Sequence, residues 1–138
     1  MGHQTVQQAM TSNPTSITPD TPAREAARMM KSEDTGVVPI VEGGRLVGVI
    51  TDRDLALRVL GEDRSSDTSV GELASKELVT IDPQQSLEEA ARLMAEHQVR
   101  RLPVVEEDGR LVGILSQKDL AEAGHDTLTG DVVQKISQ

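Results

Sequence analysis

Apolar residues recur with two different periods in the first half of the chain. Ala26, Met29 and Met30 follow one another at spacings of three and one, so that they share one face of a helix. Two apolar runs come next at 37–41 and 45–51, joined by a glutamate and two glycines, and this pattern is typical of a β-hairpin. The first half therefore predicts a helix with one buried face, followed by two paired strands.

The second half of the chain repeats this pattern. Its helical stripe and its hairpin strands comprise Leu87, Ala90, Ala91 and Met94, followed by 101–105 and 110–116. REAARMM at 24–30 returns as EEAARLM at 88–94, and GRLVGVITDRDL at 44–55 returns as GRLVGILSQKDL at 109–120. Two such matches in the same order indicate an internal duplication, which has to be recognised before the fold can be assigned.

Each copy is expected to run strand, helix, strand, strand and helix, which places the chain in the α+β class. The leading strand is a short extended piece around Ile17 or Ile81 that ends at a proline. A short helix, beginning at Val6 or Val70, is expected to lead into each copy.

The expected domain organisation has four parts. Repeat 1 is placed at 5–62, a polar linker at 63–69, repeat 2 at 70–123, and a tail at 124–138 whose single candidate element is a short helix. A chain of 138 residues is long enough for one core, so the two repeats are expected to share it.

Helix starts are marked by short polar motifs. Thr21 is expected to cap the main helix of repeat 1, with Pro22 as its first helical residue. Ser86 opens a capping box in repeat 2, with a glutamate three residues on. The last helix of each repeat is expected to begin directly after the hairpin, at Asp52 or Gln117.

Composition narrows the class of protein. The chain carries 14 Lys and Arg against 23 Asp and Glu, a formal net charge of −9, which opposes binding to nucleic acid or to anionic membranes. It has no cysteine, no signal-peptide pattern and no apolar run long enough to span a bilayer. We therefore expect a cytoplasmic protein with no nucleic-acid or membrane partner.

Three motifs occur in the same order in both repeats. They are P-x5-E-A-A-x-x-M, a P-[IV]-V strand, and G-R-L-V-G-x-x-[ST]-x-x-D-L. Together they resemble the cystathionine β-synthase (CBS) domain, and the tandem copies resemble a CBS pair, or Bateman module, over roughly residues 5–123. The segments ITDRDL and EHQVRRLPVV are also similar to stand-alone bacterial proteins of the hypoxic response protein type.

The resemblance implies two repeats related by a pseudo-twofold axis and packed through their sheets, with two clefts. Many family members bind AMP, ADP or ATP there as a regulatory ligand, and others bind S-adenosylmethionine, NAD or no known ligand. CBS pairs commonly dimerise into a disc of four CBS units, so a homodimer is expected. No cofactor is required for this role.

The candidate ligand sites combine a hydroxyl and a carboxylate three residues apart, where the last strand turns into the last helix. They are Thr51 with Asp54 and Ser116 with Asp119. A carboxylate can accept both vicinal hydroxyls of a ribose, while a hydroxyl and the N–H groups of a helix start suit a phosphate. In the alternative interpretation these side chains merely cap their helices.

The family pattern adds residues that flank these turns. They are Thr35, Gly36 and Val37 in repeat 1, Val99, Arg100 and Arg101 in repeat 2, and Thr15 and Val79 at the entry to the leading strands. The chain has no Phe, Tyr or Trp. An adenine ring would therefore be held by aliphatic side chains and backbone rather than by aromatic stacking.

The two repeats differ in charge at the flanking positions. Arg100 and Arg101 stand where repeat 1 has a glycine and a valine, and guanidinium groups suit phosphate oxygens. We expect the repeat 2 site to bind a phosphorylated ligand more tightly, and the repeat 1 site to be weaker or to prefer an unphosphorylated nucleoside unless Arg53 compensates. Alternatively, the two arginines line an exposed strand edge or pair with Glu96 or Glu106.

No catalytic constellation is recognisable in the sequence. His3, His97 and His125 are isolated, and there is no glycine-rich phosphate loop followed by Lys-Ser/Thr. The acidic hairpin tip at 106–108 is either a solvated turn or a weak candidate for a cation site. The leading interpretation is a non-catalytic regulatory module for adenine nucleotides, with a ligand-free interaction protein and an enzyme as alternatives.

Overall fold

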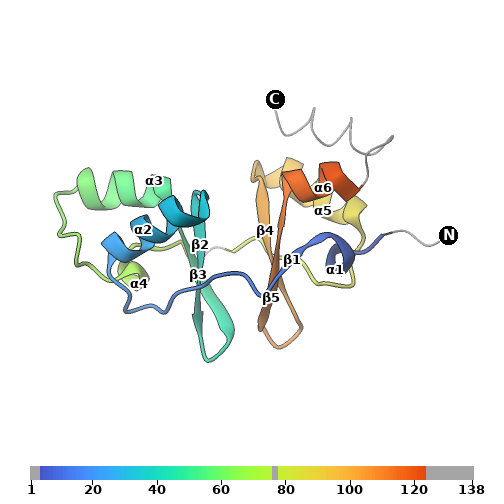
Figure 1. Cartoon of the computed structure of the whole chain (residues 1–138), viewed down its shortest axis with the longest axis horizontal. Helices are drawn as coiled ribbons and strands as arrows, with labels where there is room; N and C mark the ends of the chain where they lie inside the picture. Colours follow the sequence, from blue (N-terminus) through green and yellow to red (C-terminus); the bar gives the residue numbers. More distant parts are fainter. Residues whose placement is uncertain (1–3, 76–77, 124–138) are drawn as a thin grey trace. The chain divides into compact units, whose positions relative to one another are not determined.

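The computed structural model describes residues 4–75 and 78–123, which divide into two compact units. The first-repeat unit comprises residues 15–78, and the second-repeat unit combines the chain up to residue 14 with the chain from residue 79 onward. Each unit holds one antiparallel β-hairpin with helices against one of its faces (Figure 1).

The first-repeat unit is built on the hairpin that the two apolar runs predict. Its elements are α2 (Ala23–Glu33), β2 (Val37–Glu42), β3 (Arg45–Thr51), α3 (Asp52–Asp54), the π-helix η1 (Leu55–Leu60) and α4 (Val70–Leu73). Ile17 forms a parallel bridge to Ile40 in β2, as an extended leading strand would. Ala26 and Met30 of the α2 stripe are buried in the core, and Met29 packs against it, so the predicted helix face is confirmed.

The second-repeat unit has the same plan with one additional strand. Its elements are α1 (Val6–Ala9), β1 (Thr11–Ser12), α5 (Leu87–His97), β4 (Arg101–Val105), β5 (Leu111–Ser116) and α6 (Gln117–Ala123). The strand order is β1-β5-β4, and Ile81 forms a parallel bridge to Val104. Leu87, Ala90 and Met94 of the predicted stripe are buried.

The duplication is visible in the irregularities of the two hairpins as well as in their regular parts. A shift of register interrupts β2–β3 between Ile40 and Val41, and β4–β5 between Val104 and Val105. These are equivalent positions in the two repeats, so the two hairpins share one bulged geometry.

The short leading helices are exchanged between the repeats. Val6 of α1 is completely buried in the core of the second-repeat unit, and its N–H donates to the Gln85 carbonyl at 2.8 Å. Val70 of α4 is completely buried in the first-repeat unit, and its N–H donates to the Thr21 carbonyl at 2.8 Å. The packing units therefore differ from the expected repeats at 5–62 and 70–123, because each leading helix fills the core of the other repeat.

The helix starts agree with the sequence in three of four places. α3 begins at Asp52 and α6 at Gln117, and the Ser86 hydroxyl accepts the N–H of Glu89 at 3.1 Å. Thr21 is not the cap of α2; Pro22 precedes that helix in an extended conformation. The first N–H groups of α2 donate instead to backbone carbonyls of the expected linker, at 2.8 and 3.0 Å, which removes the need for a side-chain cap.

No helix within residues 4–75 and 78–123 combines the length and the apolar character needed to cross a membrane.

Candidate functional site

The turn from β5 into α6 closes on itself through two reciprocal hydrogen bonds. The Ser116 N–H donates to Asp119 Oδ2 at 2.9 Å, and the Asp119 N–H donates to Ser116 Oγ at 3.0 Å. Both residues are half-buried. The spacing of three residues therefore produces a capping box, and it fixes the direction of both side chains.

The turn from β3 into α3 has the same construction. The Thr51 N–H donates to Asp54 Oδ2 at 2.9 Å, and the Asp54 N–H donates to Thr51 Oγ1 at 3.0 Å. The capping interpretation of the sequence is thus correct for the local structure of both turns. Capping does not use every polar group of the turn. Each capping pair uses one carboxylate oxygen, so the second oxygen can still accept a hydrogen bond, and each hydroxyl can still donate its own proton.

Two of the helix-start N–H groups that the sequence offers to a phosphate at each turn have partners within the chain. Besides the capping N–H groups, the N–H of Gln117 donates to the Arg100 carbonyl at 2.8 Å, and the N–H of Asp52 donates to the Gly36 carbonyl at 2.9 Å. Strand pairing continues one residue into the helix and consumes these donors. An anion at either turn therefore finds fewer backbone donors than an uncapped helix start would offer.

Basic side chains gather at the second-repeat turn. Arg100, Arg101, Ser116, Gln117, Lys118 and Ala121 line a pocket of about 420 Å³ between the start of β4 and the start of α6. Arg101 lies directly opposite Ser116 in the β4–β5 register. The three cationic side chains of the pocket belong to exposed residues, so they can reach a ligand there.

The arginines of this pocket form no ion pairs within the described residues. The two glutamates that the sequence offered as partners are occupied elsewhere: Glu96 pairs with Arg92 at 2.9 Å, and Glu106 pairs with Arg110 at 2.7 Å. The hydrogen bond donated to Glu106 raises the pKa of Arg110. The ion-pair interpretation of Arg100 and Arg101 is therefore wrong, and an exposed strand edge or a ligand remains.

The first-repeat turn has different neighbours. Val37 lies opposite Thr51 in the β2–β3 register, the position that Arg101 holds in the other unit. At Gly36 an added Cβ would lie 2.8 Å from Oδ2 of Asp52, so a carboxylate stands close to this backbone. The Thr35 hydroxyl accepts the Val37 N–H at 3.3 Å in a local turn. This side of the duplication is acidic where the other is basic.

Three other predicted residues have local roles in their units. The Thr15 hydroxyl donates to Glu33 at 3.3 Å, and Val79 and Val99 pack against the core of the second-repeat unit. The structure thus brings Arg100, Arg101, Ser116 and Asp119 together through the pocket and the capping box. It shows no hydrogen bond, among the residues it describes, that links Thr15 or Val79 to either turn.

Lys118 is the pocket residue that sequence reasoning missed. It stands between Ser116 and Asp119, at one of the two variable positions of the motif. The corresponding residue of repeat 1 is Arg53, and the retained positive charge was the signal that could have identified it.

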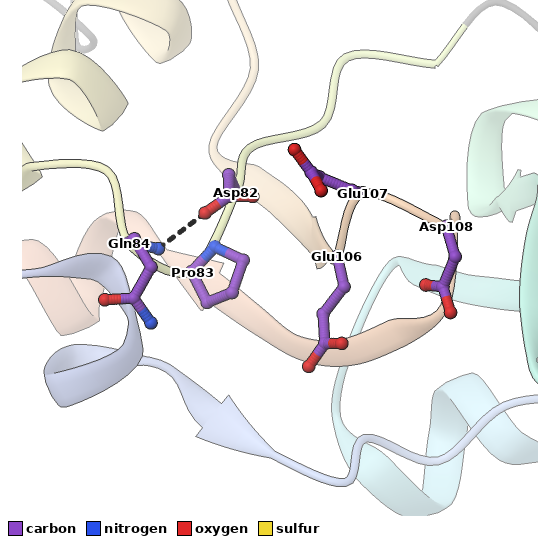
Figure 2. Close-up of a pocket in the computed structure, with 6 residues that line it drawn as sticks. All are labelled: Asp82, Pro83, Gln84, Glu106, Glu107 and Asp108. Carbon is purple, nitrogen blue, oxygen red and sulfur yellow. Dashed lines mark hydrogen bonds between the residues drawn. The ribbon is translucent and has the colours of Figure 1, made fainter.

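The acidic hairpin tip lines a second pocket, of about 600 Å³, with Asp82, Pro83, Gln84, Glu106, Glu107 and Asp108. Figure 2 shows that the carboxylates point in different directions and that Asp82 is directed to Gln84, whose N–H donates to it at 2.8 Å. Within the described residues no group of three metal-ligating side chains is placed to hold an ion. The local role of this tip is to pair with its own backbone and with Arg110.

Comparison with known proteins decides the family. The model of the CBS domain matches residues 6–61 and again residues 70–126. The chain belongs to the CBS domain family. The tandem duplication and the mixed α+β fold expected from the sequence are thereby confirmed.

Two curated relatives resemble the CBS pair over most of its length. CBS domain-containing protein YhcV of Bacillus subtilis is 46% identical over 116 residues, covering 84% of this chain and 82% of YhcV. Hypoxic response protein 1 of Mycobacterium tuberculosis is 41% identical over 98 residues, covering 70% of this chain and 68% of that protein.

Solved CBS structures share the fold. Hypoxic Response Protein I, solved with two coordinated zinc ions, matches with a TM-score of 0.79 and 36% identity, covering 86% of this chain and 98% of that one. CBSX2, solved in complex with AMP, matches with a TM-score of 0.79 and 31% identity, covering 90% of this chain and 97% of that one.

Proposed function

We propose that this CBS pair is a non-catalytic regulatory module that binds an adenine nucleotide of the AMP, ADP and ATP class at the Ser116–Asp119 turn. The observation that carries the proposal is the pocket in which Arg100 and Arg101 lie beside Ser116 without ion-pair partners. A module of similar fold, CBSX2, was solved with AMP, which supports the same ligand class here.

Each side chain of the turn has a defined task in this proposal. The oxygen of Asp119 that the capping box does not use accepts a ribose hydroxyl, and the Ser116 hydroxyl donates its proton to a phosphate oxygen. Arg100 and Arg101 neutralise the phosphate with charge-assisted hydrogen bonds. The adenine ring, in a chain without aromatic residues, is held by aliphatic side chains and backbone.

Binding regulates through a difference in affinity between two arrangements of the protein. A ligand shifts such an equilibrium only as far as it binds one arrangement more tightly than the other. The bound nucleotide therefore has to change the free-energy difference between two arrangements of either the CBS pair or its homodimer. No step of covalent chemistry is required, and a cytoplasmic location gives access to the nucleotide.

A homodimer is the second part of the proposal. Among the described residues the exposed large apolar side chains are Val47, Leu57 and Leu60, of which the two leucines lie three positions apart on η1 with 54% and 78% of their surface exposed. A second copy of the chain would cover this pair. Contacts of that kind remove apolar surface from water and so favour association.

The deciding experiment is calorimetric titration of the purified chain with AMP, compared with Arg101→Ala. Loss of a charge-assisted phosphate contact should weaken AMP binding about tenfold. Arg45→Ala is the matched control, because Arg45 is also an exposed arginine at the first position of a hairpin strand. Unchanged AMP affinity in Arg101→Ala would remove the assigned role of this pocket.

The competing function is that of a ligand-free interaction protein. One observation favours it, because the capping hydrogen bonds of both turns form without a ligand. The two functions are separated by extracting the purified protein with acid and analysing the extract for nucleotides. S-adenosylmethionine and NADH belong in the same titration series, since other CBS pairs take these ligands.

A further inference from the structure

We propose that the second-repeat pocket prefers an adenylate with two or three phosphates to the monophosphate, and that Lys118 sets this preference. The inference rests on the proposed nucleotide site and specifies its ligand. It starts from the charge of the pocket, where Arg100, Arg101 and Lys118 supply three positive side chains within one lining.

In a chain rich in carboxylates, this pocket gathers three cations that form no ion pair within the described residues. Carboxylates outnumber cations by 23 to 14, and most arginines of the described residues are engaged: with Asp67, Glu25, Glu62, Glu89, Glu96 and Glu106 as ion pairs, or with the Leu73 carbonyl. Because these three cations line one pocket, their combined charge is available to an anion from outside the chain.

The number of cations exceeds what one phosphate requires. A terminal phosphate carries about two negative charges near neutral pH. Two arginines already match that charge, and their planar guanidinium groups suit the oxygens of one phosphate. Lys118 follows Gln117 at the start of α6, whereas Arg101 begins β4 and Arg100 directly precedes it, so the pocket draws its cations from two elements. A compact ammonium at that place suits a second or third phosphate.

The backbone strengthens the dependence on Lys118. At this turn the N–H groups of Gln117 and Asp119 are committed to the Arg100 carbonyl and to Ser116 Oγ. These two backbone donors are not open to additional phosphates, whose charge the basic side chains would neutralise. The first-repeat turn is expected to have no preference for additional phosphates. It carries the carboxylate of Asp52, and its basic residue is Arg53.

The test is titration of wild-type protein and of Lys118→Gln with AMP, ADP and ATP in buffer without divalent cations. We expect the wild type to bind ATP about tenfold more tightly than AMP, and Lys118→Gln to reduce this ratio to about twofold with a smaller change for AMP. ATP affinity should also fall more steeply than AMP affinity as salt is raised.

Lys31→Gln is the matched control, because Lys31 is an exposed lysine on α2 and the variant has the same net charge as Lys118→Gln. It should keep the wild-type ratio of ATP to AMP affinity. Inorganic tripolyphosphate tests the phosphate contacts without the nucleoside, and it should compete with ATP for the wild type and compete less well for Lys118→Gln.

The outcomes separate this inference from the proposed function. If AMP and ATP bind the wild type equally, the preference is overturned while nucleotide binding stands. If Lys118→Gln weakens both by one factor, the assignment of the preference to Lys118 is overturned. A failure of tripolyphosphate to compete would also overturn it. If no adenylate binds at all, the proposed function fails, and the assignment of Lys118 fails with it.

Discussion

The turns at Thr51 and at Ser116 share a backbone and differ in charge. Their capping hydrogen bonds have the same lengths, 2.9 and 3.0 Å, and the next N–H donates across to the neighbouring strand end at 2.9 Å in one and 2.8 Å in the other. Around this common frame one turn has Gly36 and Asp52, and the other has Arg100 and Gln117.

This difference separates the role of the duplicated scaffold from the role of its variable residues. The hydroxyl and the carboxylate of each turn are needed to start a helix, so they are present in both repeats whether or not a ligand binds. The side chains of Arg100 and Arg101 have no such structural role among the described residues. Their charges are therefore the better indicator of which turn binds an anion and of what kind.

The largest effect is expected from grafting the second turn onto the first. The triple variant Gly36→Arg, Val37→Arg and Asp52→Gln gives the Thr51 turn the charges of the Ser116 turn. Its affinity for AMP should rise about tenfold at the weaker site, because two guanidinium groups replace one carboxylate. Titration calorimetry analysed with two sites measures this gain.

Asp52→Gln alone serves as the control for the graft. It removes one carboxylate and adds no cation, so a gain of about twofold is expected. A triple variant that melts like the wild type and gives the wild-type isotherm would show that flanking charge does not distinguish the two turns.

A smaller effect is expected from removing the hydroxyl of each turn. Thr51→Ala and Ser116→Ala should each lower the free energy of unfolding by about 1 kcal/mol, because each leaves a helix-start N–H without its acceptor. Urea unfolding measures this loss. AMP affinity should fall more in Ser116→Ala than in Thr51→Ala, and equal losses in the two variants would contradict the assigned asymmetry. Ser116→Thr keeps the cap and should restore binding.

The smallest effect concerns the last helices of the two repeats. η1 exposes Leu57 and Leu60, whereas the residue of α6 that corresponds to Leu57 is Glu122. Leu60→Ser should weaken homodimer formation about threefold, because less apolar surface is removed from water. Sedimentation equilibrium measures it, and Val47→Ser is the control for loss of an exposed apolar side chain. Equal dissociation constants for both variants and the wild type would exclude η1 from the interface.

The sequence predicts the strands and main helices well because their signals are local. The hairpins were expected at 37–41 with 45–51 and at 101–105 with 110–116, and the strands begin and end within one residue of these limits. Apolar runs and the short turn between them are properties of neighbouring positions, so no distant contact is needed to recognise them.

What the sequence missed depends on distant partners. Thr21 has a hydroxyl that could cap the helix, but the first N–H groups of α2 donate to the carbonyls of residues 66 and 68 instead. The exchange of α1 and α4 is likewise decided by which core has room for Val6 and Val70. The π-helical turns of η1 also lay outside the prediction, because its residues are ordinary helix formers.

The candidate site was predicted in part for the same reason. Ser116, Asp119, Arg100 and Arg101 fall in motifs, and the structure gathers them around one pocket and its capping box. Lys118 was passed over because a variable position in a motif gives no signal until its neighbours in space are known.

The exchange of leading helices sets an order in which the chain can fold during its synthesis. Residues 15–78 are continuous, so their core can close while the ribosome is still making the second repeat. The core that contains Val6 must wait for Leu102 and Leu115, which are synthesised 96 and 109 residues later. Contacts of such long range close slowly. Helix α1 is therefore synthesised before residues 15–78 and packs into its core after them.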